Sequence, residues 1–375
     1  MGGRGIRFVG AMLLCLAGPA EAIAADLDVL APEALYPLAR EEGRVVIYSA
    51  TSRIHKIEPL FEARYPGIDL IAFDIGSMEQ VTRLKAERRA GIRNADVVYL
   101  TDAAALLRDR STAALALGYV PPRMETRIPY RYREPLLAHR LSTKVLMYNA
   151  ADYPDGPPVH NLWQLTEPDW HGRVILVDPA MRTDYLDLIG EFLLRSAELG
   201  AAYQRLFGRP LVLPPGVACA GEQFVRALFD NGAILVSNTR QVNEAIGRPG
   251  QSRRFVGFAT YSDRRSNAAN GWALEIAADV DPAPGIVYPV IIAPVADAPH
   301  PAAARLLIDF MMGDNSERGG PAVAPFVVPG DYLTRVDIPA HPDAVPLSLL
   351  AAWRTDPARG GSLRQRTFDL VLALE

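Results

Sequence analysis

Four short polar segments carry the residue types that could bind an anion. They comprise Ser49, Thr51 and Ser52; Gly76 and Ser77; Arg182, Thr183 and Asp184; and Asn238, Thr239 and Arg240. Each lies where an apolar run gives way to a segment with helical spacing. A helix N-terminus offers unpaired backbone N–H groups and a partial positive charge, and an arginine adds a bidentate donor for a carboxylate or phosphate. We expect these residues to bind a small organic anion, phosphorylated or carboxylated.

Each candidate also has a structural interpretation. Ser77 and Thr183 could serve only as helix caps, and Arg182 and Arg240 could be solvated surface charges. Tyr185 and Trp272, the aromatic residues near these segments, could stack on a ring or sugar, but core packing is the favoured interpretation of both.

The elements that position these segments alternate between strand and helix. In the first part of the chain, residues 44–48, 68–73 and 95–100 read as strands. Helical spacing follows the first strand from Ile54, and follows the second from Ser77, which forms a capping-box pattern with Gln80. Strand-helix-strand units at this spacing predict parallel strands in an open α/β sheet, where ligands lie beyond the carboxyl ends of the strands.

A second α/β stretch extends from about residue 148 to 262. Strands are predicted at 173–177 and 233–237, and helices at 183–198, near 224–231 and from Thr239 onward. Residues 286–292 then read as a strand and 302–312 as a helix, and the proline-rich region 323–346 is expected to be extended chain on the surface.

The N-terminus has the pattern of a secretory signal peptide. Arg4 and Arg7 precede an apolar stretch at 8–16 that is too short to span a bilayer, and Ala22-Ile23-Ala24 suits cleavage before Ala25. We expect residues 1–24 to be removed; an uncleaved anchor helix is the alternative. The remaining chain is long enough for two lobes. Only Cys219 would remain, so no internal disulfide is expected.

Composition limits the partners. The formal charge of −4 comes without any lysine- or arginine-rich run typical of nucleic-acid binding, and no later segment is apolar enough to cross a membrane. We expect neither nucleic-acid binding nor membrane insertion.

Seven segments carry a family resemblance through their order and spacing. They are GRVVIYS at 43–49, FEARYPG at 61–67, NADVV at 94–98, NLWQL at 161–165, WHGR at 170–173, YPV at 288–290 and APHP at 298–301. Together they resemble the ferric-ion-binding branch of ABC-transporter solute-binding proteins, a branch that also includes binders of phosphorylated sugars and phosphonates. The resemblance covers most of the chain after the signal peptide.

The resemblance implies a two-lobed α/β periplasmic-binding-protein fold, type II-like, with a ligand cleft between lobes joined by crossover strands. The first lobe would comprise 25–137 and 293–345, the second 138–292, and residues 346–375 would pack on the lobes as a tail or helix. It further implies a periplasmic monomer whose partners are an ABC permease and its ATPase. A ligand-binding subunit of a sensor system remains an alternative.

The sequence departs from the iron-binding pattern. The resemblance implies an adjacent tyrosine pair after a strand of the second lobe, but Asn238-Thr239-Arg240 stands there. Ser52 occupies the place of the expected histidine, although His55 is near, and Glu79 could match the expected carboxylate. Since an arginine would repel a trivalent cation, an organic anion is favoured and iron is the alternative.

Enzymatic patterns are absent from the sequence. There is no Gly-x-Ser-x-Gly elbow, no His-Glu-x-x-His pair, and no metal-ligand spacing among the six histidines. His171 and His300 are interpreted as structural, and Cys219 as an inert buried thiol. We therefore expect no catalytic residue, no metal site and no cofactor.

Overall fold

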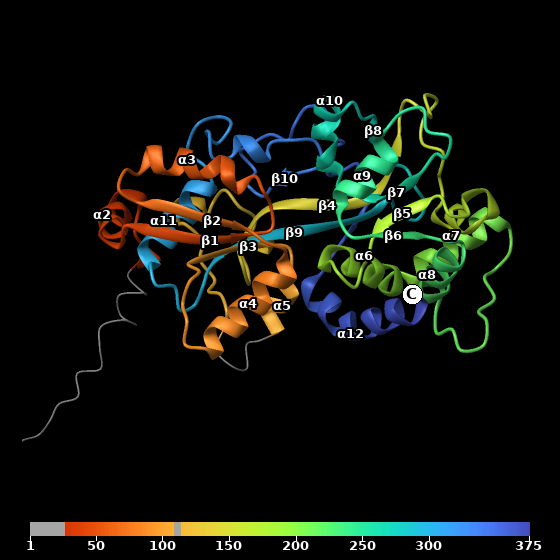
Figure 1. Cartoon of the computed structure of the whole chain (residues 1–375), viewed down its shortest axis with the longest axis horizontal. Coiled ribbons are helices and arrows are strands. Elements are labelled where there is room, and N and C mark those ends of the chain that lie inside the picture. The colour runs from red at the N-terminus through yellow and green to blue at the C-terminus, as the bar shows by residue number, and fades with distance from the viewer. Residues whose placement is uncertain (1–26, 109–113) are drawn as a thin grey trace, which may run out of the picture.

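The computed structural model describes residues 27–108 and 114–375, and its strands join into one sheet that runs through two lobes (Figure 1). The expected signal peptide lies outside the described residues. The strands are β1 (Arg44–Ser49), β2 (Asp69–Asp74), β3 (Val97–Leu100), β4 (Ala138–Asn149), β5 (Val174–Val177), β6 (Ile234–Val236), β7 (Val256–Ala259), β8 (Leu274–Ile276), β9 (Gly285–Pro294), β10 (Tyr332–Leu333) and β11 (Trp353–Arg354). The sheet order is β2-β1-β3-β9-β4-β7-β5-β6, with β8 and β10 on β4 and β11 on β9.

Helices cover both faces of this sheet. They are α2 (Pro32–Glu42), α3 (Ile54–Arg64), α4 (Ser77–Arg89), α5 (Ala103–Arg108), α6 (Thr183–Leu194), α7 (Ser196–Phe207), α8 (Ala220–Asp230), α9 (Thr239–Gly247), α10 (Asn267–Asn270), α11 (Pro301–Met311) and α12 (Pro357–Leu374). The strands and helices expected from the sequence are present, with ends that shift by a few residues. The helix expected at 183–198 is two helices, α6 and α7, divided at Arg195.

The first lobe is built on β2, β1 and β3, which are parallel, and on β9, which is antiparallel to β3. Alternate residues of β1 point to opposite faces. Val45 and Ile47 pack in one core with helices α2, α3 and α11, whereas Val46 and Tyr48 pack in another with α4 and α5. Burial on both faces explains why β1 is an unbroken apolar run.

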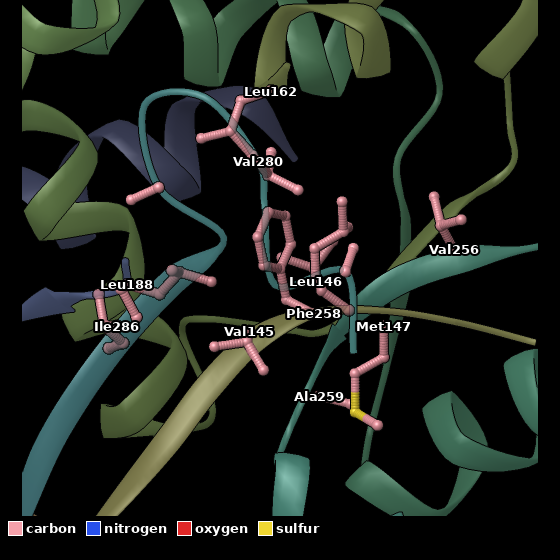
Figure 2. Close-up of a cluster of buried hydrophobic side chains, with 14 of the residues drawn as sticks. Val145, Leu146, Met147, Leu162, Leu188, Val256, Phe258, Ala259, Val280 and Ile286 are labelled. Carbon is pink, nitrogen blue, oxygen red and sulfur yellow. The ribbon is translucent and has the colours of Figure 1, made fainter. Parts of the chain in front are cut away.

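The second lobe has one large core around β4, β7 and β5. Figure 2 shows part of it, where Leu146 and Met147 of β4 lie beside Phe258 of β7, with Leu188 of α6 and Ile286 of β9 nearby. Helices α6 and α8 lie on one side of the sheet and α9 on the other (Figure 1).

Two long strands connect the lobes. These crossover strands, β4 and β9, pair antiparallel along most of their length; β9 also pairs with β3 of the first lobe, and β4 with β7 of the second. The boundaries expected at 137/138 and 292/293 coincide with the start of β4 and lie close to the end of β9. Division of the chain at these residues remains a proposal.

The C-terminal part of the chain returns to both lobes. Region 323–346 is not only surface chain, because β10 pairs with β4 and Asp331 is fully buried. After β11 joins β9, helix α12 packs on α6 of the second lobe and lies against α5 of the first. Among the described residues, no helix is long and apolar enough to cross a membrane.

Candidate ligand-binding cleft

A polar cavity of about 310 Å³ lies between the lobes, at the carboxyl ends of β1, β2 and β3. Its lining comes from the first lobe (Ala50, Thr51, Ser52, Arg53, Asp74, Gly76, Ser77, Thr101), from the crossover strands (Arg140, Ser142, Tyr288) and from the second lobe (Arg182, Asp184, Thr239, Thr260, Ser262, Asp263, Arg265). Its volume suits a small molecule, and hydroxyl and charged groups dominate its surface.

The turn after β1 is held by its own serine. The Ser49 hydroxyl donates to the carbonyl oxygen of Thr51 at 3.0 Å and accepts from the Thr51 backbone N–H at 3.2 Å. This local hydrogen bonding places Thr51 and Ser52 in the cleft while Ser49 itself stays buried beneath it.

The junction before α4 differs from the expected capping box. Gly76 is the N-cap residue and has no side-chain cap, and Gln80 donates to the carbonyl oxygens of Ile75 and Tyr99. The Ser77 hydroxyl lies 3.0 Å from that of Thr101 and accepts from the Thr101 backbone N–H at 3.1 Å. The capping-box prediction is therefore wrong: Ser77 links the start of α4 to the end of β3, and both hydroxyls line the cleft.

Two arginines of the cleft lining share one carboxylate, Asp331, that is buried behind them. Nη1 of Arg53 and Nη1 of Arg140 each contact a different oxygen of Asp331. The three side chains are at most 8% exposed. Burial by itself would raise the pKa of Asp331, but Arg140 and Arg53 outweigh it and hold that pKa below its ordinary value.

The remaining donors of this pair fix its orientation. Arg53 Nη2 donates to Ser262 Oγ at 3.1 Å, and Arg140 Nε donates to the Tyr99 hydroxyl at 2.9 Å. Tyr99 in turn lies 2.8 Å from Nδ1 of His139, and burial lowers the pKa of that ring to about 3, so the ring is neutral. Nη2 of Arg140 has no hydrogen-bond partner among the described residues and can donate to a ligand.

A second charged group belongs to the other lobe. Asp184 accepts from Nη2 of Arg182 at 3.0 Å and lies 2.9 Å from Nζ of Lys144, which also donates to Thr260 Oγ1 at 2.8 Å. Burial would raise the pKa of Asp184, but Lys144 and then Arg182 lower it below its ordinary value. The Asp184 carboxylate is therefore paired with Lys144 and Arg182. The Arg182 side chain lines the cleft and is 42% exposed.

Ser262 joins the two lobes within the cleft. Its hydroxyl accepts from Arg53 of the first lobe, and its carbonyl oxygen accepts from Nη1 of Arg265 at 2.5 Å. Arg265 also pairs with Asp263 at 2.8 Å. Four arginines thus surround one cavity, where the lining carboxylates are Asp74, Asp184 and Asp263.

The structure brings most of the expected site residues together, but not all. Thr51, Ser52, Gly76, Ser77, Arg182, Asp184 and Thr239 line the cleft. Ser49 and Thr183 are buried behind it. Asn238 caps α9 by accepting from the Gln241 N–H at 3.1 Å, and Arg240 is exposed outside the lining. Successive helical residues point about 100° apart, which explains why Thr239 faces the cleft and Arg240 does not.

Sequence reasoning missed the two arginines that meet on Asp331, Arg53 and Arg140. Arg53 directly follows the polar turn, so a window one residue wider would have included it. Arg140 is a charged residue in a strand whose every position is buried, a pattern that requires a partner. No local signal marked Asp331, which lies in the proline-rich region.

The aromatic, histidine and cysteine residues considered in the sequence have structural positions. Tyr185 is fully buried and donates to the Phe258 carbonyl oxygen at 2.9 Å, and Trp272 packs against the second-lobe core, so core packing is confirmed for both. His300 lies 2.9 Å from Asp96 and ties the start of α11 to the first lobe. Cys219 is a free thiol, but it is only partly buried, contrary to expectation.

The cleft has few groups suited to a metal cation. Within residues 27–108 and 114–375, no three His, Cys, Asp or Glu side chains are grouped to hold a metal. Burial, and then the Asp184 carboxylate, raise the pKa of Tyr288 far above its ordinary value, so this phenol stays neutral. His55 pairs with Glu58, and neither it nor Glu79 lines the cleft.

These features define the class of protein: two α/β lobes, joined by crossover strands, around a polar cleft. The chain belongs to the bacterial extracellular solute-binding proteins, because that family's model matches residues 45–318. The resemblance inferred from the seven segments is confirmed. Proteins of this family bind solutes. No curated protein sequence matches the chain.

Solved structures of periplasmic binding proteins share the fold. Iron-bound HitA from Pseudomonas aeruginosa is 19% identical, covers 88% of this chain and 99% of its own, and superposes with a TM-score of 0.66. AfuA from Actinobacillus pleuropneumoniae, solved with fructose-6-phosphate, is 18% identical, with coverage of 87% and 97% and a TM-score of 0.64. Apo ferric ion-binding protein A from Pasteurella haemolytica is 14% identical, with coverage of 88% and 98% and a TM-score of 0.64. The two-lobed periplasmic-binding-protein fold is thus confirmed.

Proposed function

We propose that the chain is the periplasmic solute-binding component of an ABC import system and captures a small phosphorylated or carboxylated organic anion. The observation that carries this proposal is the set of four arginines, Arg53, Arg140, Arg182 and Arg265, around one polar cavity. Membership of an extracellular solute-binding family and the expected signal peptide support the location.

The electrostatics of the cleft favour an anion over ferric ion. Two of its arginines are held in place by Asp331, so their orientation is fixed before a ligand arrives. Guanidinium groups match the oxygens of phosphate and carboxylate through paired N–H donors, whereas they repel a metal cation. The hydroxyls of Thr51, Ser77 and Thr101 would complete such a site as neutral donors.

Capture would proceed by closure of the lobes. Arg53 lies on the first lobe and Arg182 and Arg265 on the second, so an anion that contacts all three stabilises the closed arrangement. Closure can bend the crossover strands β4 and β9, and Arg140 on β4 would contact the ligand from the hinge. An ABC permease with its ATPase would receive the closed monomer.

Thermal unfolding with separate candidate ligands tests this proposal. A ligand at 100 times its dissociation constant adds about 2.7 kcal/mol of stability. We expect stabilisation by fructose 6-phosphate, an alkylphosphonate or a dicarboxylate, and none by ferric ion in a buffer free of coordinating anions. Stabilisation by ferric ion alone would contradict the proposal. A genomic neighbour encoding a sensor kinase in place of a permease would contradict the transport role.

A further inference from the structure

We propose a second ligand site, behind the hinge, that binds an amphiphilic organic anion with a short apolar tail and one carboxylate. It occupies a cavity of about 370 Å³ on the opposite face of the crossover strands from the cleft. On β9, Tyr288 lines the cleft while Val287 and Pro289 line this hinge pocket. On β4, Ser142 faces the cleft and Leu141 faces the pocket, as the alternation of a strand requires.

The walls of the hinge pocket are apolar. Leu136, Ala138 and Leu141 lie beside Val287, Pro289 and Ile291 and form one apolar face with them, because Ala138 pairs with Ile291 and Leu141 with Pro289. This apolar face offers no hydrogen-bond partners to water, so an apolar group that covers it gains free energy. The cleft, lined by arginines and hydroxyls, offers no comparable surface, so the two sites select different chemistry.

Two arginines at the mouth of the hinge pocket supply the polar contact. Arg354 donates from Nη1 to the Tyr132 hydroxyl at 3.2 Å, and the Arg131 guanidinium lies 4.7 Å from the centre of the Tyr132 ring. Both arginines are exposed and line the pocket. Glu134 and Asp356 also reach the lining, so a carboxylate is accepted only on the side of Arg131 and Arg354.

This arrangement selects the ligand. The arginines hold the carboxylate at the mouth, and an unbranched tail lies across the apolar face of the paired crossover strands. A sugar phosphate would leave its hydroxyls without partners against Leu136 and Ile291, which disfavours it. A neutral molecule with the same tail would lose the contact to the arginines.

Isothermal titration calorimetry of the mature protein with octanoate tests the hinge pocket. We expect octanoate to bind, and Arg354→Gln to weaken that binding at least tenfold. Ala138→Phe, which places a ring inside the pocket, should abolish it. Arg209→Gln, the same charge change at an exposed position after α7 in the second lobe, is the matched control and should leave octanoate affinity unchanged.

Circular dichroism would verify that each variant is folded, and Arg354→Gln provides a test at an exposed position if Ala138→Phe does not fold. Absence of octanoate binding to the wild type would overturn the proposal. Equal binding to Arg354→Gln and Arg209→Gln, or unchanged binding to folded Ala138→Phe, would overturn it as well. The cleft arginines also match a carboxylate, so cleft variant Arg182→Gln separates the two sites and should leave octanoate affinity unchanged. Octanoate binding that is weakened by Arg182→Gln and not by Arg354→Gln would assign octanoate to the cleft and overturn the proposal.

Discussion

Replacing Asp331 by asparagine tests whether the cleft arginines depend on their buried carboxylate. The amide has nearly the same volume, but it carries no charge and leaves two guanidiniums that are 8% and 7% exposed without a counter-ion. Breaking a buried ion pair by removing one partner costs about 3 to 5 kcal/mol. Arg53 keeps its bond to Ser262 and Arg140 its bond to Tyr99, so we expect a loss of about 4 kcal/mol in the free energy of unfolding.

Urea denaturation at neutral pH, with sulfate or with chloride at equal ionic strength, measures this loss and its origin. Sulfate should restore more stability to Asp331→Asn than to the wild type, because an anion in the cleft can neutralise the two arginines. Asp343→Asn, at a side chain that is 72% exposed, is the matched control and should change stability by less than about 0.5 kcal/mol.

The pH dependence gives the same variant a second readout. Because the pKa of Asp331 is lowered in the folded protein, its contribution is fully present above its ordinary value near 4 and is lost as the pH falls further. Asp331→Asn should lack that part of the acid destabilisation. A loss below about 1 kcal/mol at neutral pH, with no difference between sulfate and chloride, would refute the reasoning.

Two further variants probe the groups around the cleft. Wild-type His139 has a pKa of about 3 and stays neutral at pH 4.5, whereas the same imidazole in the unfolded chain takes up a proton. The wild type should therefore lose about 2 to 3 kcal/mol more of its free energy of unfolding between pH 7 and 4.5 than His139→Asn does. Equal urea curves for both proteins across this pH range would contradict this. Arg364 of α12 contacts Asp102 before α5 at 2.7 Å and Asp187 of α6 at 2.9 Å, and so ties the lobes together. Arg364→Met removes the partner of both carboxylates and should lower the free energy of unfolding by about 2 to 3 kcal/mol. Burial raises the pKa of Asp187 to about 7, so the loss should be larger at pH 8, where Asp187 is charged, than at pH 5, where it is protonated. A loss that is the same at both pH values would show that Arg364 does not act through Asp187.

Much of the fold could be predicted because each element carries its own pattern. The apolar run of β1 and the helical spacing after it are local signals, and parallel strands follow from their order along the chain. The division of one expected helix at Arg195 was not predictable, because the apolar periodicity of α6 and α7 continues across it.

The site was harder to predict because it depends on contacts distant in sequence. Local patterns placed Thr51, Ser77 and Arg182 at the cleft, since strand ends and helix starts determine where they lie. They could not indicate that Arg53 and Arg140 meet on Asp331, about 190 to 280 residues further along the chain. Whether Arg240 faces the cleft depends on its position in α9, because neighbouring residues of a helix point about 100° apart. Local sequence patterns could not fix that position to within one residue.

The central claim is that the cleft arginines bind an organic anion, and the dissociation constant of that anion in matched variants measures it most directly. With the stabilising ligand from the thermal screen, Arg182→Gln and Arg265→Gln should each weaken binding at least tenfold, a loss of about 1.4 kcal/mol. Arg240→Gln, the same change at an exposed helix position outside the cleft lining, should leave the dissociation constant unchanged. Equal affinity in all three folded variants, or loss of binding only in Arg240→Gln, would contradict the assignment of the cleft.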